Sequence, residues 1–150
     1  MKKSQRLKVI VDLNAENEKK ALQELGKIQT KKQELQKQLE NLKQYRQEYN
    51  DQCQSISEAG VNIAKLLEFR SFVSKLGKVI EDQEKAISTM EGKLIFARKT
   101  WERQHHKTKS LQKVCDSAKA EEVKKEDKRE QNEQDERATR SGRNSGTKSA

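Results

Sequence analysis

The chain has 150 residues, of which 38% are charged and 31% hydrophobic, and its formal net charge is +9. So small an apolar share cannot fill the core of a globular domain, while the regular spacing of the apolar residues argues against disorder. The sequence contains no Pro and only six Gly, so it offers few positions where a helix must end. The composition therefore indicates long helices that bury one narrow apolar stripe.

The first predicted helix covers about residues 3–57. Its stripe alternates steps of three and four residues, which is the period of a left-handed coiled coil. The stripe consists of Leu7, Val11, Asn14, Glu18, Ala21, Leu25, Ile28, Lys32, Leu35, Leu39, Leu42, Arg46, Tyr49, Cys53 and Ile56. This pattern predicts that one face of the helix packs against another helix along its whole length.

A bend is predicted at about residues 58–63, with Gly60 ending the first helix. The second predicted helix covers about residues 64–123 and carries a stripe of its own. That stripe consists of Leu66, Phe69, Val73, Leu76, Ile80, Gln83, Ile87, Met90, Leu94, Ala97, Trp101, Gln104, Thr108, Leu111 and Cys115.

The two stripes can be superimposed in one antiparallel register, which predicts an all-α fold, a long antiparallel two-helix coiled-coil hairpin over residues 1–123. In this register Leu25 faces Ala97 and Ala21 faces Trp101, so small residues meet large ones. The alternative is one continuous helix in a parallel dimer. The shift of the stripe by one residue across Gly60 favours the hairpin.

Polar residues within the stripes are also expected to face one another. The register places Asn14 opposite Thr108 and Glu18 opposite Gln104. We expect their buried polar atoms to satisfy each other, which would penalise a slipped register.

The remaining segment, residues 124–150, is charged and has almost nothing to bury. Residues 124–140 are nearly all charged or amide, and residues 141–150 are rich in Ser and Gly. We expect a frayed or disordered tail here.

Positive charge is densest at residues 93–113, where Glu102 is the single acidic residue among Lys93, Arg98, Lys99, Arg103, Lys107, Lys109 and Lys113. Such a surface favours acidic partners, anionic lipid or nucleic acid. No aromatic platform or groove-entering motif accompanies it, so we expect no specific nucleic-acid binding.

The sequence carries no pattern typical of an enzyme: no Gly-rich phosphate loop and no nucleophile with a supporting base. His105 and His106 point about 100° apart on a helix, so they cannot share a metal, and we expect both in the solvated basic patch. We therefore predict no catalytic residue, no metal and no cofactor.

The sequence predicts a cytoplasmic protein without direct membrane insertion. No apolar run is long enough for a signal peptide or a membrane-spanning helix. Two cysteines agree with a reducing compartment.

One side of the predicted seam near the bend differs from the other. Its flanking positions carry Gln38, Tyr45, Phe72, Val79 and Ala86. The opposite side is polar and carries Gln36, Lys43, Asn50, Arg70, Gly77 and Glu84. An aromatic and aliphatic strip on one side indicates a partner-binding surface; the alternative is that these side chains only widen the seam.

A second candidate surface lies at the end of the hairpin opposite the bend. Val9, Ile10, Leu13 and Val114 lie outside the stripes there. They could enter a socket on a partner, or they could be ordinary exposed aliphatic residues.

Three stretches stand out for their aromatic residues: Leu42-Lys-Gln-Tyr45-Arg-Gln-Glu-Tyr49, Phe69-Arg-Ser-Phe72-Val73-Ser-Lys-Leu76 continuing to Val79, Ile80 and Gln83, and Ala97-Arg-Lys-Thr-Trp101. Together they resemble the flagellar type III export protein FliJ family, over about residues 1–120. The resemblance implies a cytoplasmic hairpin similar to the central stalk of rotary ATPases.

The resemblance implies three partners and no catalysis. The open end, with Val9, Ile10, Leu13 and Val114, is expected to enter and stimulate the hexameric ring of the flagellar export ATPase. Export chaperones are expected to be recycled, and the cytoplasmic domain of the membrane export gate to be bound, which would hold the chain peripherally at the membrane. The implied gate-binding residues are Gln38, Leu42, Tyr45, Tyr49, Phe72, Leu76, Val79 and Gln83.

The resulting hypothesis is a non-catalytic stalk and adaptor needed for flagellum assembly and motility. The alternatives are the related stalk of a virulence-type secretion system, a structural coiled-coil dimer, and a non-specific nucleic-acid binder that uses the basic patch.

Overall fold

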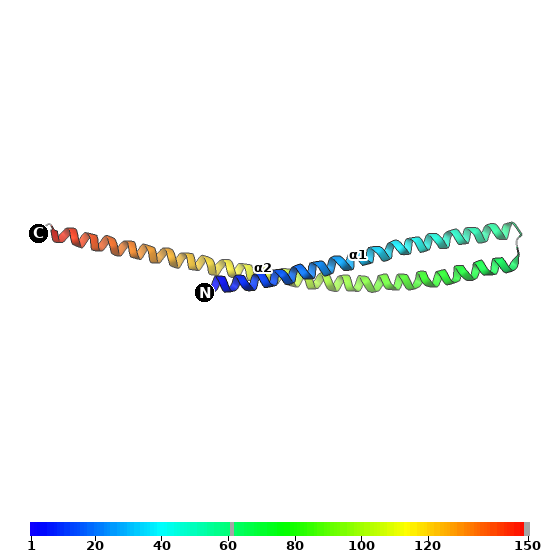
Figure 1. Ribbon diagram of the computed structural model, residues 1–150, viewed down its shortest axis with the longest axis horizontal. Helices are drawn as coiled ribbons and strands as arrows, with labels where there is room; N and C mark the ends of the chain where they lie inside the picture. Colours follow the sequence, from blue (N-terminus) through cyan, green and yellow to red (C-terminus); the bar gives the residue numbers. More distant parts are fainter. Residues whose placement is uncertain (61, 149–150) are drawn as a thin grey trace. The chain divides into compact units, whose positions relative to one another are not determined.

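The computed structural model describes residues 1–60 and 62–148, with side chains described up to residue 143. It consists of two helices, α1 (Lys3–Glu58) and α2 (Ile63–Lys148), which pack against each other in antiparallel directions (Figure 1). The described residues contain no strand. The predicted all-α hairpin is therefore confirmed.

The bend between the helices is built by Gly60 and Asn62. Gly60 has a φ of 70°, a left-handed conformation that ends α1 and that a side chain would make unfavourable. The side-chain oxygen of Asn62 accepts a hydrogen bond from the N–H of Ala64 (3.2 Å) and so caps the start of α2. A glycine stop followed at once by a helix cap reverses the chain within a few residues.

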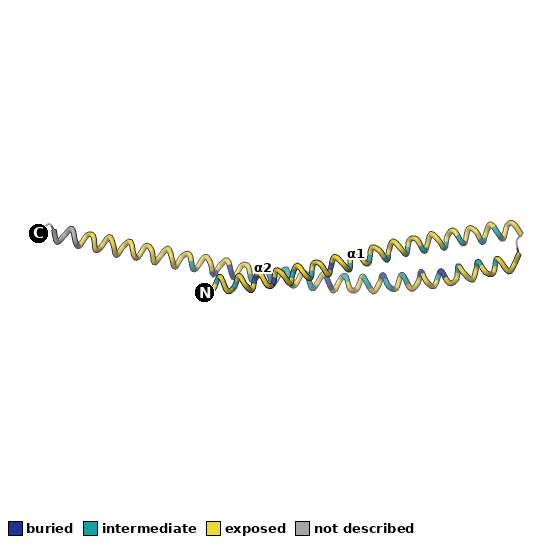
Figure 2. Tube along the Cα trace, in the orientation of Figure 1, coloured by how far each residue is buried: buried dark blue, intermediate teal, exposed yellow. Residues whose placement is uncertain are grey.

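The chain divides into two compact units, one formed by Met1–Glu18 with Gln104–Ala150 and the other by Lys19–Arg103. In each unit the contact between α1 and α2 is made by the predicted stripes. Every residue of both stripes is buried or half-buried, and nearly all positions between them are exposed (Figure 2). The least exposed apolar residues are Val11, Leu25, Leu76, Ile80, Ile87, Ala97, Cys115 and Ala118.

Contacts within the Lys19–Arg103 unit agree with the predicted register. The register that places Leu25 opposite Ala97 also places Lys32 opposite Met90. In the structure, Nζ of Lys32 lies 3.6 Å from the carboxylate of Glu91, the residue next to Met90. The side-chain amide of Gln83 donates to the carbonyl of Leu35 (3.1 Å), one turn from the assigned partner Leu39.

The predicted polar pairs are not formed. Asn14 is buried, but its side-chain amide donates to the carbonyl of Ile10 on its own helix (3.0 Å). Thr108 likewise donates to the carbonyl of Gln104 (2.9 Å). Short polar side chains can bond to the helix backbone one turn earlier, and for Asn14 this local partner replaces the one expected across the seam.

Glu18 also has a different partner from the one expected. Its carboxylate lies 2.6 Å from Nδ1 of His105, a residue that we had placed in the solvated patch. His105 directly follows the seam residue Gln104, so its ring can fold back over the seam edge and reach the carboxylate of α1.

The structure also extends α2 to Lys148, whereas we expected a frayed or disordered tail after about residue 123. Residues 124–143 are all exposed, so this part of α2 buries no side chain. The stretch lacks Pro and contains many Lys, Glu, Gln and Arg residues, which favour helix without any packing partner.

Within the described residues, neither helix is apolar enough over a sufficient length to span a membrane.

Candidate functional site

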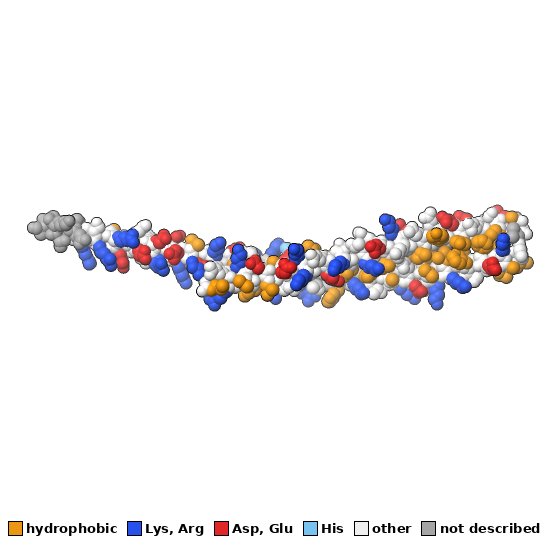
Figure 3. Space-filling model, viewed as in Figure 1, with side chains coloured by type: hydrophobic (Ala, Val, Ile, Leu, Met, Phe, Trp, Pro, Cys, Tyr) orange, Lys and Arg blue, Asp and Glu red, His pale blue; other side chains and the backbone are white. Residues whose placement is uncertain are grey.

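The main candidate surface lies in the Lys19–Arg103 unit. We call the set Gln38, Tyr45, Phe72, Val79 and Ala86 the aromatic flank. Tyr45, Phe72 and Val79 are 57%, 45% and 49% exposed. Figure 3 shows hydrophobic side chains gathered on one face near the bend. Large apolar side chains are therefore presented to solvent, as a partner-binding surface requires.

The ring of Phe72 is supported by the seam. Tyr49, which is half-buried, lies with its ring centroid 4.6 Å from that of Phe72 and 5.9 Å from that of Phe69. Tilted rings at these separations attract each other. Because Phe72 is already held in place, a partner that packs on it has to immobilise little.

Gln83 supports the other end of the flank. Besides its bond to Leu35, its side-chain amide donates to Oε1 of Gln38 (3.2 Å). Gln83 is half-buried and Gln38 is exposed. The hydrogen bond thus links the seam to a polar group at the surface.

The eight residues proposed from the family resemblance do not all reach the surface. Gln38, Tyr45, Phe72 and Val79 are exposed, Leu42, Tyr49 and Gln83 are half-buried, and Leu76 is only 9% exposed. Leu76 therefore lies in the seam beneath the surface, where it can support a partner contact without making much of one itself.

The opposite side of the seam is polar, as predicted. Lys43 and Glu84 form an ion pair across the two helices there (3.7 Å). An exposed pair of this kind contributes little stability, but it keeps this side hydrated. The contrast between the two sides is therefore a property of the folded unit.

The second candidate surface belongs to the unit formed by Met1–Glu18 and Gln104–Ala150. Val9, Ile10, Leu13 and Val114 are 61%, 44%, 63% and 49% exposed. Figure 3 shows hydrophobic side chains on the surface at the start of α1. These four residues are thus available to a partner.

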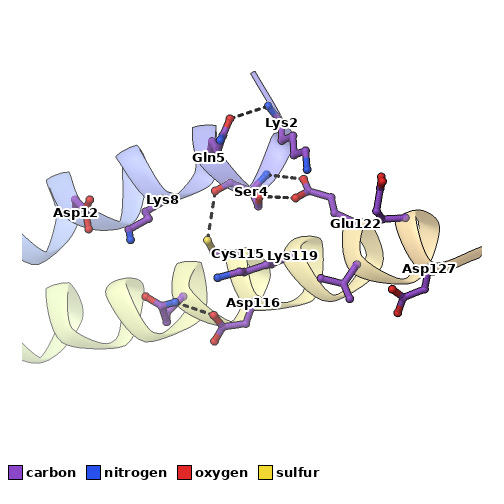
Figure 4. A pocket seen from close by; sticks show the side chains of 13 residues that line it. Lys2, Ser4, Gln5, Lys8, Asp12, Cys115, Asp116, Lys119, Glu122 and Asp127 are labelled. Carbon is purple, nitrogen blue, oxygen red and sulfur yellow. Dashed lines mark hydrogen bonds between the residues drawn. The ribbon is translucent and has the colours of Figure 1, made fainter. Parts of the chain in front are cut away.

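The same unit contains a polar groove that the sequence did not predict (Figure 4). The carboxylate of Glu122 accepts hydrogen bonds from the N–H of Ser4 (3.0 Å) and from its hydroxyl (2.6 Å). These bonds lower the pKa of the Glu122 carboxyl, the hydroxyl having the larger effect. The feature of the sequence that could have indicated this contact is a Glu one turn beyond Ala118, opposite the first turn of α1.

Glu18 and His105 form another contact between α1 and α2 in this unit. The hydrogen bond with His105 lowers the pKa of the Glu18 carboxyl; partial burial opposes the shift and Thr108 adds to it. Nothing in this geometry resembles a catalytic or metal centre, and no three His, Cys, Asp or Glu side chains of the described residues gather at one point.

A family model described as Flagellar FliJ protein matches residues 2–147. No curated protein and no solved structure gives a significant match. The family match extends over nearly the whole chain, including the charged segment that the resemblance did not cover. The chain therefore belongs to the FliJ family of flagellar proteins and is associated with flagellar protein export.

Proposed function

We propose that the chain is a non-catalytic stalk and adaptor of the flagellar export apparatus, and that its aromatic flank binds the cytoplasmic domain of the membrane export gate. The observation that carries this proposal is the exposure of Tyr45, Phe72 and Val79 on one side of the seam, opposite a polar side. The positions that the family uses for gate binding include these three residues and Gln38.

The proposed role of the flank is to anchor the stalk through a few rigid aromatic contacts. Phe72 is held by Tyr49, and Gln38 is held by Gln83. Binding hot spots have this character, with a central aromatic anchor and polar neighbours. Gate binding would bring the chain to the cytoplasmic side of the membrane.

The proposed role of the other unit is to enter the ring of the export ATPase. Val9, Ile10, Leu13 and Val114 provide exposed aliphatic side chains for a socket there. A stalk seated in the ring would couple the nucleotide cycle to the gate, and chaperones released by exported cargo would be recycled through the same adaptor.

The test of gate binding uses Phe72→Asp with Asn50→Asp as its matched control. Both substitutions add one negative charge at an exposed position, but Asn50 lies on the polar side. We expect Phe72→Asp to weaken binding to the purified cytoplasmic domain of the gate by at least about tenfold and to reduce motility, with unchanged helix content. Equal binding by both variants would reject the flank as the gate-binding surface.

The test of the stalk role is a titration of the protein into the export ATPase while ATP hydrolysis is followed. Stimulation that saturates near one chain per ring, and that is lost in Leu13→Asp, supports the proposal. No stimulation and no co-elution with the ATPase would remove the stalk role and leave gate binding as a separate question.

A further inference from the structure

A second apolar surface of the Lys19–Arg103 unit is not used by the proposed function. It is a groove between α1 and α2 lined mainly by Ala21, Ile28, Gly92, Lys93, Phe96 and Ala97. None of these residues belongs to the aromatic flank. The side chain of Phe96 is 68% exposed, so it contributes almost nothing to the seam.

The groove exists because three neighbouring positions carry little or no side chain. Ala21 and Ala97 belong to the two stripes, where most other apolar residues are large. At Gly92, a Cβ built on the backbone would meet no heavy atom within 4 Å. Space is therefore left beside an exposed phenyl ring, which is the arrangement of an apolar anchor site.

Basic residues outnumber acidic ones at the heptad positions beside this groove. By heptad position, the residues on this side of α1 and α2 around the groove include five cations and one carboxylate: Lys20, Lys27, Lys31, Lys93, Arg103 and Glu24. All six are exposed, and none of the five cations forms an ion pair with the residues that the structure describes. The lining of the groove itself carries one carboxylate, Glu24, and one cation, Lys93, and the excess of positive charge lies at the neighbouring positions of α1 and α2.

We propose that this groove binds an acidic amphipathic helix of a partner protein. A groove between two antiparallel helices runs along them and accepts a third helix, which completes a three-helix bundle. The apolar side chains of the partner would lie against Phe96, Ala97 and Ala21, and its carboxylates would face Lys93 and the lysines of α1. The proposal does not depend on gate binding, because it uses different residues.

The test uses a synthetic helical peptide with Leu at positions i, i+3, i+4 and i+7 and Glu at the others. A matched peptide with Lys in place of Glu, and polyglutamate without Leu, are the controls. Trp101, the single Trp, is four residues from Ala97 on α2 and provides a fluorescence signal; calorimetry gives an independent measure. We expect saturable binding of the acidic peptide and at least about tenfold weaker binding of both controls.

The decisive variant is Gly92→Leu, which fills the groove. Because Gly is unfavourable inside a helix, this change should stabilise α2 while it blocks the peptide. Phe96→Ser should weaken binding by about tenfold or more, whereas Ile95→Ser should not, since Ile95 is 56% exposed but does not line the groove.

Two results would overturn the proposal. One is the absence of binding of the acidic peptide by both fluorescence and calorimetry. The other is binding that Gly92→Leu leaves unchanged and that polyglutamate or a short DNA duplex reproduces. The lysines would then form a general polyanion site without an apolar anchor.

Discussion

Glu122 on α2 caps the start of α1, because its carboxylate accepts hydrogen bonds from both the N–H and the hydroxyl of Ser4. The first N–H groups of a helix have no partner within the helix, and negative charge is favourable near them. A residue distant in sequence thus supplies what a local capping residue usually provides. The contact also ties the start of α1 to α2 beyond the last predicted seam residues.

This cap predicts a pH-dependent stability. The pKa of Glu122 is lowered on folding, so its contribution is present above the pKa of the unfolded chain and is lost as the pH falls through the folded pKa. We expect Glu122→Gln to lower the melting temperature at pH 7, and we expect this effect to shrink as the pH falls through the folded pKa and the wild-type carboxyl becomes protonated. Circular dichroism over a pH series measures the difference.

Glu121→Gln is the control for this prediction. It removes the same charge one residue earlier, at an exposed position outside the polar groove, and should not reproduce the pH dependence. A Glu122→Gln variant that melts like the wild type at pH 7 would show that the cap contributes nothing to stability.

The pair of Glu18 and His105 gives a second prediction. We expect His105→Ala to destabilise the chain by about 1 kcal/mol at neutral pH, the lower part of the range for a hydrogen bond to a charged group, because both side chains are partly exposed. The loss should shrink in acid, once Glu18 is protonated. His106→Ala, an exposed neighbour, should be neutral in chemical denaturation; equal effects of the two changes would contradict the pairing.

The seam was predictable from sequence because burial in a helix pair depends only on spacing. Every residue that the steps of three and four assigned to the two stripes is buried or half-buried in the structure. Hydrogen-bond partners were not predictable in the same way. Asn14 bonds to the backbone of its own helix, and Glu18 bonds to His105 instead of the adjacent Gln104. The spacing of residues along the helix does not show which of several possible hydrogen-bond partners is favoured.

Of the two apolar surfaces of the Lys19–Arg103 unit, one could be predicted from sequence and the other could not. The aromatic flank could be found by comparing the two sides of the seam, since it depends on which residues are present. The groove beside Phe96 could not be found in this way, because it depends on space left at Gly92, Ala21 and Ala97 by side chains that are absent. The segment after about residue 123 was expected to be frayed or disordered because it has almost nothing to bury, whereas α2 continues to Lys148, which helix propensity alone favours.

Two Gly→Ala substitutions should have opposite effects on stability. Gly26 lies inside α1 with open space around it, so Gly26→Ala should stabilise the chain by up to about 1 kcal/mol. Gly60 has a φ of 70°, so Gly60→Ala should destabilise it by about 1 kcal/mol or more. Urea denaturation of both variants measures the two changes, and effects of equal sign would contradict the bend geometry.

A last prediction separates support from contact at the aromatic flank. Leu76 is buried in the seam, so Leu76→Ala should cost about 2 kcal/mol or more of stability by leaving a cavity. Tyr45 is 57% exposed, so Tyr45→Ala should change stability by less than about 0.5 kcal/mol. If the flank binds the export gate, Tyr45→Ala should nevertheless weaken gate binding more than Leu76→Met, which keeps the seam filled.

The comparison is informative because the two residues come from the same set of eight implied by the family. Gate binding measured well below the melting temperature of each variant removes the contribution of unfolding. Loss of binding in Leu76→Met with full binding in Tyr45→Ala would mean that the seam opens when the partner binds, because Leu76 could then reach the gate only by leaving its buried position.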